Sequence, residues 1–419
     1  MTTGARRRAW GGSLCHHELM VDGGSETEIL QRAPHASAGV RPALADLSTA
    51  LERLGIDIVG PLPPGLSRTL LYETMGPDGR GVVKVLGADP AAVDGHDLHS
   101  FRLKPRQVAF LRRMLPAVAE LHVPVLHELD GDGWSAHIMP WAEGEHLLQN
   151  PSRSRQRLLE VVETLCVRGW QERRPSEPGN LARTLVGRIW RRWSFLEGVV
   201  PAAALAGRGM RVNSVACRPL REVLAEAAAL LPPLEPAHLA PPVHGDLNTR
   251  NVVMGAAGVR LIDPRGSLED LDPCYDVGKL LLSVSMWDAF ADGSGSGRVV
   301  VDGEAADVQV PTLPGRARLL ADLPSLLADS HGLPEALGPR WPARLALVHA
   351  CHTVAEAACR VSDARAKCLP PATIAHHACA FLLVGLVLLE DAVARVRGQN
   401  DVDLADHLQL MSIFYGSEV

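Results

Sequence analysis

The sequence has no cysteine pair of the C-x-x-C type, although it contains eight cysteines. Structural zinc sites commonly need such closely spaced thiol ligands, so this absence disfavours a zinc site. Several cysteines lie among alanines and leucines, as in Ala358-Cys359 and Ala378-Cys379, where a reduced thiol acts as a small apolar side chain. We therefore expect the thiols to be reduced and the protein to be cytoplasmic.

An excess of positive charge is also lacking. The chain carries 42 Lys and Arg against 48 Asp and Glu, which gives a formal net charge of -6 and a pI near 6.3. A broad nucleic-acid surface needs a basic face, so we expect no nucleic-acid partner.

Long apolar runs are scarce as well. The best candidate, Ala378 to Leu389, has about a dozen apolar residues before Glu390, whereas a membrane span needs about 20. At the N-terminus, Arg6-Arg7-Arg8 is followed by Trp10-Gly11-Gly12-Ser13 and not by an apolar run, which disfavours a secretory signal. We expect no membrane association, and the sequence leaves the oligomeric state open.

What the sequence does contain is ample material for a packed core, with 47% hydrophobic residues in 419. Residues 1–45 show no sustained periodicity, and we expect a poorly ordered extension with a helix beginning near Ala43. From Ile56 the pattern is that of a small antiparallel sheet, because short β-branched runs alternate with Gly-Pro and Asp-Gly turns. The expected strands are residues 56–59, 69–73, 81–86, 123–128 and 134–139.

Helical patterns dominate the rest. A helix is expected to open at Pro105, with Val108, Leu111 and Leu115 on one face. After a connector at residues 140–144 the chain turns helical through about residue 232, and again from about residue 314 to 411. Hairpins are expected within residues 243–263 and 298–310, the second around the turn Asp302-Gly303.

The strongest chemical signal is the run from Val243 to Asn251, V-H-G-D-L-N-T-R-N, followed by Ile262-Asp263. Phosphoryl transfer needs a carboxylate to orient and deprotonate the acceptor hydroxyl, and oxygen ligands for the metal that neutralises the β- and γ-phosphates. An Asp and an Asn five residues apart, with a second Asp ending the next hairpin, can supply these groups. Either half alone could be an ordinary turn or strand end. Together, downstream of a strand bearing Lys84, they indicate phosphoryl transfer.

This pattern, with the later run Asp272-Pro273-x-x-Asp276-x-x-Lys279, resembles the motif of aminoglycoside phosphotransferases, homoserine and fructosamine kinases and choline kinases. The resemblance implies that Asp246 is the catalytic base and that Asn251 and Asp263 bind magnesium. It also implies that His244 and Asp276 shape the catalytic loop by hydrogen bonding.

The same resemblance implies the fold, an α+β protein-kinase-like bilobe. Residues 46–140 would form a small nucleotide-binding lobe with an antiparallel sheet (the N-lobe). Residues 141–419 would form a mainly helical catalytic and acceptor-binding lobe (the C-lobe). ATP and Mg²⁺ would be the cofactors, and a small molecule such as a sugar, amino alcohol or antibiotic would be the acceptor.

Nucleotide contacts are expected from Lys84, which would pair with the α- and β-phosphates, and from Ser67 in the loop at residues 60–67. The three prolines of that loop remove N–H donors, so it would contact phosphate mainly through residues 65–67. Met139 and Trp141 stand where backbone groups would meet the adenine edge, although an ordinary connector fits these residues nearly as well.

Two positions depart from the relatives' pattern. Gln107 stands where a glutamate would pair with the strand lysine, and we expect its amide oxygen to hold Lys84, with Asp97 as the alternative partner. Arg265 follows the metal aspartate, where it could face phosphates or acceptor, or lie on the surface paired with Glu269 or Asp270. Because of Gln107, a second hypothesis is a nucleotide-binding pseudokinase or scaffold with little turnover.

Overall fold

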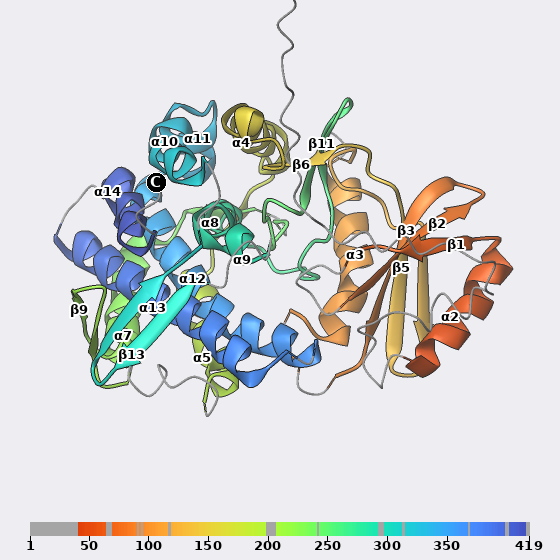
Figure 1. Cartoon of the computed structure of the whole chain (residues 1–419). Coiled ribbons are helices and arrows are strands. Elements are labelled where there is room, and N and C mark those ends of the chain that lie inside the picture. Colours follow the sequence, from red (N-terminus) through yellow and green to blue (C-terminus); the bar gives the residue numbers. More distant parts are fainter. Residues whose placement is uncertain are drawn as a thin grey trace, which may run out of the picture.

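The structure is a computed structural model that describes residues 41–415, apart from 64–68, 90–91, 94, 116–118, 198–206, 241–242, 292–296, 312–314, 368 and 399–401. The predicted extension before residue 41 and the predicted phosphate contact Ser67 lie outside the described residues. Two lobes are visible in Figure 1, with the sheet-containing N-lobe on the right and the helical C-lobe on the left.

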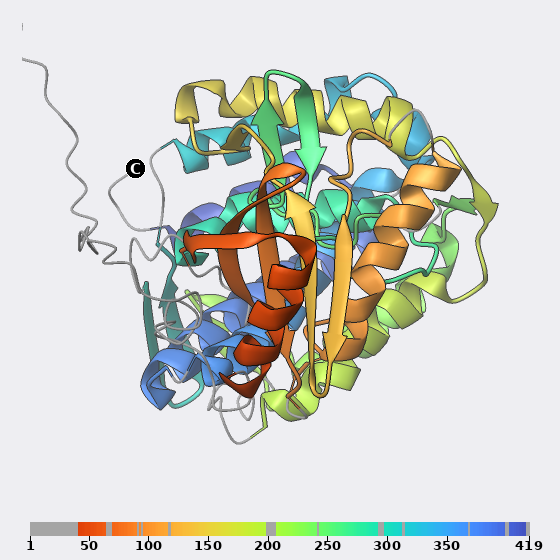
Figure 2. The same cartoon turned by 90° about the vertical axis from the view of Figure 1, so that its right-hand side faces the viewer.

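The N-lobe is built on a five-stranded antiparallel sheet in the order β1-β2-β3-β5-β4. Helix α2 packs on the sheet through Leu44, Leu47 and Leu51, which share a core with buried side chains of β2, β3 and β5. Figure 2 shows the sheet face-on, with α2 in front of it and α3 beside it. The elements are α2 (Arg41–Leu54), β1 (Asp57–Pro61), β2 (Leu70–Gly76), β3 (Gly79–Gly87), α3 (Leu98–Met114), β4 (His127–Gly131) and β5 (Trp134–Pro140).

Helix α3 begins earlier than Pro105. Asp97 is its N-cap, accepting from the Ser100 N–H at 2.9 Å, and Pro105 lies inside the helix. A side-chain cap satisfies an N–H that the first turn otherwise leaves without a partner, and this accounts for the start of the helix after Asp97. The prediction of the helix start was therefore wrong, and the helix also includes residues 98–104, Lys104 among them.

The C-lobe is mainly helical, with one large apolar core. Its helices are α4 (Ser154–Thr164), α5 (Gly187–Arg192), α7 (Leu220–Leu230), α8 (Cys274–Leu282), α9 (Asp288–Ala291), α10 (Arg316–Asp329), α11 (Leu333–Leu337), α12 (Trp341–Ala366), α13 (Pro371–Gly398) and α14 (Leu404–Gln409). Together with the N-lobe sheet this is the α+β bilobe that the resemblance implies, so the fold prediction is confirmed.

Short strands interrupt the C-lobe helices. The predicted hairpins are present as β11 with β12 and as β13 with β14. An unexpected hairpin, β8 with β9, lies in the stretch that we expected to be helical and extends the second of these into a four-stranded sheet. The strands are β6 (Glu145–His146), β7 (Arg174–Pro175), β8 (Met210–Val212), β9 (Val215–Cys217), β10 (His238–Leu239), β11 (Val252–Gly255), β12 (Gly258–Leu261), β13 (Arg298–Asp302) and β14 (Ala305–Gln309).

Helix α13 is long and apolar enough to cross a membrane by length and composition. Its most apolar window is 72% buried inside the protein, where the helix packs along α12. A buried core helix has the same composition as a membrane span, so the apolarity of α13 is weak evidence for one.

Candidate active site

The loop that follows Val243 is held by one buried carboxylate. Asp276, at the start of α8, is fully buried and accepts from the N–H groups of His244 (2.9 Å) and Gly245 (2.7 Å). The ring of His244 donates from Nε2 to the Ile262 carbonyl (2.8 Å), which ties the loop to the end of β12. These contacts are those expected of His244 and Asp276. Burial raises the pKa of Asp276 to about 7, although the two N–H donors act in the opposite direction.

Asp246 projects from this loop into the cleft between the lobes. Its Oδ1 lies 3.1 Å from Lys279 Nζ, and Asn251 Nδ2 donates to its main-chain oxygen (2.9 Å) and to its Oδ2 (3.3 Å). Burial alone raises the pKa of the Asp246 carboxyl, but the ammonium of Lys279 more than offsets this and holds the pKa well below its usual range. Asp246 is therefore ionised at neutral pH, as an acceptor of a hydroxyl proton must be.

Asp263 lies at the end of the hairpin in a left-handed backbone conformation, with φ of 56°. Aspartate tolerates this region better than most residues, and such conformations often mark functional sites. Its Oδ2 lies 2.6 Å from Lys84 Nζ and its Oδ1 2.5 Å from Lys104 Nζ. Burial raises the pKa of Asp263, but the two lysines lower it well below its usual range. Lys84 and Lys104 of the N-lobe therefore both contact the carboxylate of Asp263, which belongs to the C-lobe.

Gln107 is not the partner of Lys84, so that prediction is wrong. Its side chain is fully buried; Nε2 donates to the carbonyl oxygens of Val243 (2.8 Å) and His244 (3.3 Å), and Oε1 accepts from the N–H groups of Gly266 (2.7 Å) and Ser267 (3.1 Å). The amide thus joins the catalytic loop to the segment after Asp263. This needs both a donor and an acceptor, which explains an amide where a carboxylate was expected.

The alternative partner, Asp97, is also excluded as the ligand of Lys84. Its carboxylate accepts from Ser100 and from the Gly95 N–H (3.0 Å) at the start of α3. The residue of α3 that reaches the cleft is Lys104, one turn before Gln107, and sequence reasoning missed it because the predicted helix began one residue later. Gly266 explains the close approach of α3, since a Cβ there would lie 1.9 Å from the Ser100 carbonyl oxygen.

Replacing Gln107 with leucine is expected to lower the free energy of unfolding by about 1–3 kcal/mol for each buried backbone group that loses its partner. At neutral pH, Gln107→Glu should lower the free energy of unfolding at least as much as Gln107→Leu does, because a carboxylate would face the carbonyl oxygens of Val243 and His244. Urea unfolding measures both. The exposed neighbour Arg106, replaced by leucine, is the control. A Gln107→Glu protein as stable as wild type would contradict this account of the amide.

The predicted adenine contacts are only partly as expected. The Trp141 N–H donates to the Arg80 carbonyl (3.0 Å), and the Arg80 guanidinium lies 3.7 Å above the Trp141 ring. That N–H is therefore already paired, which contradicts its part in the prediction, whereas an adenine contact through the Trp141 carbonyl stays a prediction. Met139 lies on β5 opposite Val82 of β3 and stays a predicted contact.

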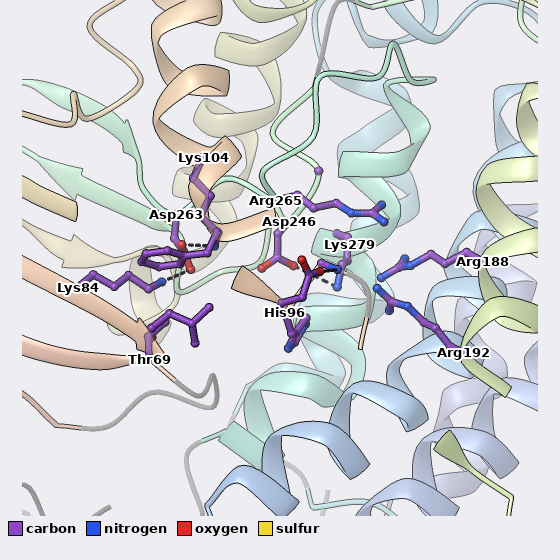
Figure 3. Close-up of a pocket in the computed structure, with 15 residues that line it drawn as sticks. Thr69, Lys84, His96, Lys104, Arg188, Arg192, Asp246, Asp263, Arg265 and Lys279 are labelled. Carbon is purple, nitrogen blue, oxygen red and sulfur yellow. Dashed lines mark hydrogen bonds and ion pairs between the residues drawn. The ribbon is translucent and has the colours of Figure 1, made fainter. Parts of the chain in front are cut away.

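Lys84, Asp246 and Asp263 line one pocket of about 610 Å³, measured out to its open mouth. Figure 3 shows Lys84, Lys104 and Asp263 at one end, Asp246 and Lys279 in the middle, and Arg188 and Arg192 at the other end. Arg265 also lines this pocket and donates to the Tyr275 hydroxyl (2.5 Å), so its side chain faces the cleft. Lys279 belongs to the motif given above, but no role was predicted for it. Besides its contact with Asp246, its Nζ lies 3.5 Å from Oε2 of the buried Glu356 of α12.

The donor set fits a magnesium site. Asp263 and Asn251 offer a carboxylate and an amide oxygen, the hard ligands that Mg²⁺ prefers, and Mg²⁺ usually takes one or two carboxylates plus substrate phosphates. Both oxygens of Asp263 already contact cationic nitrogens, so this carboxylate attracts positive charge in the cleft. Among the described residues, no group of three or more His, Cys, Asp and Glu could hold a metal by itself.

The fold and this cleft define a kinase-like phosphotransferase. The sequence matches the profile described as the phosphotransferase enzyme family over residues 21–298, so the chain belongs to that family.

Solved structures show a similar fold at low identity. An ethanolamine kinase from Plasmodium vivax is 10% identical, with 87% of this chain and 95% of that chain covered and a TM-score of 0.49. A choline kinase from Streptococcus pneumoniae is 13% identical (88% and 98% covered, TM-score 0.41), and an aminoglycoside phosphotransferase from Streptomyces rimosus is 19% identical (58% and 83% covered, TM-score 0.38). No curated protein sequence matches the chain. These distant likenesses carry no argument about the acceptor.

Proposed function

We propose that the protein transfers the γ-phosphoryl group of ATP to a hydroxyl group of a small molecule in the cytoplasm. The observation that carries this proposal is the shared pocket in which ionised Asp246 faces the same space as the Lys84–Asp263 pair. Asp246 accepts the hydroxyl proton, and Lys279 and Asn251 hold its carboxylate in place. Because its pKa is depressed, Asp246 serves mainly to orient the acceptor and to take the proton late in the reaction.

Asp263 and Asn251 would hold Mg²⁺ together with the ATP phosphates. The ion supplies charge neutralisation on the β- and γ-phosphates when it is bound. Lys84 moves from its contact with Asp263 toward the α- and β-phosphates, and Lys104 offers a second ammonium beside them. Met139 and the loop containing Ser67 are the proposed contacts for adenine and phosphate.

ATP binding is expected to weaken as pH rises through about 8. Burial, together with the nearby Lys104, lowers the pKa of Lys84 from 10.5 to about 8, although Asp263 acts in the opposite direction. Lys84 is therefore charged below that pH and neutral well above it, where it no longer attracts phosphate. Titration of ATP from pH 7 to pH 9 measures the effect. In Lys84→Arg the guanidinium stays charged, so the pH dependence should disappear; its persistence there would assign it to another group.

A pseudokinase or scaffold is the second candidate, and one observation favours it. Both oxygens of Asp263 are paired with lysines, which compete with a metal for the same carboxylate. ATP consumption by the purified protein, measured with Mg²⁺ against a panel of hydroxyl compounds, separates the two. Turnover with any member of the panel supports the kinase, whereas tight ATP binding with no turnover supports the scaffold.

A further inference from the structure

Lysine is rare in this chain and is concentrated in one place. Only four of the 42 basic residues in the sequence are lysines, and the others are arginines. Three of the four, Lys84, Lys104 and Lys279, line the same pocket. Lysine offers a compact ammonium group with three donors on a flexible stem, whereas arginine offers a planar fork. The use of lysine at these three positions therefore indicates a need for point charges in the pocket.

The ammonium group of Lys279 is held between two carboxylates. Lys279 lies on α8, and its Nζ is 3.1 Å from Asp246 Oδ1 and 3.5 Å from Glu356 Oε2. Burial alone would lower the pKa of Lys279, but these two carboxylates raise it above its ordinary value, so the group is charged. Among the residues that the structure describes, the two carboxylates account for two of the three N–H donors. The third donor can therefore serve a ligand in the pocket.

Glu356 fixes this ammonium group from the side of α12. The Glu356 side chain is buried, and its Oε1 accepts from Trp287 Nε1 (3.0 Å) and lies 2.8 Å from Arg360 Nη2. Because Oε1 is engaged in this way, Oε2 keeps its orientation toward Lys279. A cation that is already oriented needs no rearrangement when charge develops beside it.

Lys279 lies where the transferred phosphoryl group must pass. A base must be within hydrogen-bond distance of the acceptor hydroxyl, and that hydroxyl oxygen attacks the γ-phosphorus in line with the leaving oxygen. A cation that contacts the base is therefore within reach of the phosphoryl oxygens. Figure 3 shows Lys279 beside Asp246 in the middle of the pocket, whereas Lys84 lies at the end that holds Asp263.

We propose that Lys279 is a catalytic residue that donates a hydrogen bond to a non-bridging oxygen of the γ-phosphate, and that Glu356 is its positioning residue. This inference rests on the proposed phosphotransfer. Lys84 and Lys104 then serve the part of the nucleotide that remains as ADP, and Lys279 serves the group that is transferred.

The charge of Lys279 becomes more effective as the transfer proceeds. The acceptor hydroxyl oxygen forms a bond to the γ-phosphorus, while the bond from that phosphorus to the β,γ-bridging oxygen breaks and ADP leaves with its electron pair. The hydroxyl proton passes to Asp246 and then to solvent, and Lys279 keeps its own protons. Protonation makes Asp246 neutral, so one of the two carboxylates that balance Lys279 loses its charge. The ammonium group therefore attracts the phosphoryl oxygens more strongly in the transition state than in the ground state.

Binding of two nucleotides that differ in the γ-phosphate tests the contact without an acceptor. The probes, titrated by calorimetry with Mg²⁺, are ADP and the non-hydrolysable ATP analogue with an imido bridge between the β- and γ-phosphorus atoms. Lys279→Gln should weaken binding of the analogue roughly ten- to hundred-fold, as expected for loss of a charged hydrogen-bonding group, and leave ADP binding unchanged. Lys84→Gln should weaken binding of both. Arg221→Gln, at an exposed position of α7, is the control for the change of charge and should affect neither.

ADP binding also reports whether the variant has folded. If Lys279→Gln binds ADP and keeps the wild-type ratio of analogue affinity to ADP affinity, Lys279 only holds Asp246 in place and the inference is overturned. If Lys279→Gln loses ADP binding as well, the decision passes to the wild-type protein.

The scarcity of lysine makes a spectroscopic test on wild-type protein practical. Protein labelled with ¹³C and ¹⁵N in its lysine side chains gives one ammonium signal for each of four residues. Lys279→Arg assigns the Lys279 signal, or variants of the other three lysines assign it by elimination. We expect this signal to shift when the analogue replaces ADP, whereas the signal of Lys367, at the end of α12, should not shift. Signals of Lys84 and Lys104 that respond to nucleotide, with no response of Lys279 to the γ-phosphate, would overturn the inference.

The two proposals fail in different ways. If wild-type protein binds neither ADP nor the analogue, the proposed phosphotransfer fails, and the role of Lys279 fails with it. If it binds both, and neither the affinity ratio nor the Lys279 signal depends on the γ-phosphate contact, only the inference about Lys279 fails.

Discussion

Asp246→Asn is expected to lower kcat by about 10²–10⁴-fold while ATP binding stays near the wild-type level. Asparagine keeps the size of the side chain but cannot accept a proton from the acceptor hydroxyl. Its amide would also face Lys279, which lies 3.1 Å from Oδ1 of the carboxylate in the structure. The loss should therefore appear in turnover, because Asp246 lies in the middle of the pocket, away from Lys84 and Lys104, which are the proposed phosphate contacts.

Single-turnover measurement with a saturating acceptor separates this step from product release. Asp302→Asn, at the exposed turn between β13 and β14, is the control for the change of charge and should behave as wild type. The acceptor must first be found, and ATP hydrolysis in its absence offers an earlier readout. An Asp246→Asn protein that turns over its true acceptor at a near-normal rate would remove Asp246 from the role of base.

The elements of the N-lobe could be predicted from sequence because their signals are local. Turns such as Asp78-Gly79 and the β-branched runs of β3 identify hairpins without knowledge of the rest of the chain. The spacing between Asp246, Asn251 and Asp263 is also contained within one hairpin, so the structure brings these three residues together as the motif implies. The phosphate contact of Ser67 and the extension before residue 41 lie outside the described residues and stay predictions.

The partners of α3 could not be predicted, because they depend on the rotation of a helix about its axis. Taking Pro105 as the start hid the cap at Asp97 and left Lys104 outside the expected helix. The contacts of Gln107 join residues that are more than a hundred positions apart in the chain, and no local pattern reports them. The only local signal was that Gln107 stands where a glutamate was expected. That signal suggested a hydrogen bond to Lys84, whereas the amide bonds to the backbone of Val243 and Gly266.

Asp263→Asn is expected to weaken Mg²⁺-dependent ATP binding by roughly two orders of magnitude, about 3 kcal/mol, and Asn251→Ala by less. An ionised carboxylate attracts Mg²⁺ more strongly than a neutral amide does, and Asp263 is the group that the two lysines already hold in its charged form. Titration of ATP in the presence of Mg²⁺, and again with the metal chelated, measures the dependence.

The change in metal-free ATP affinity distinguishes the loss of a metal ligand from misfolding. In wild-type protein, Lys84 and Lys104 are engaged by Asp263, so metal-free ATP must compete with that carboxylate for both ammonium groups. Asp263→Asn removes the competitor, and metal-free ATP should bind as tightly as to wild type or more tightly, whereas a misfolded variant would lose both kinds of binding. Two uncompensated ammonium groups also repel each other in a buried site, so the variant should unfold at lower temperature until ATP is added. Metal dependence that survives in both Asp263→Asn and Asn251→Ala would place the metal elsewhere in the cleft.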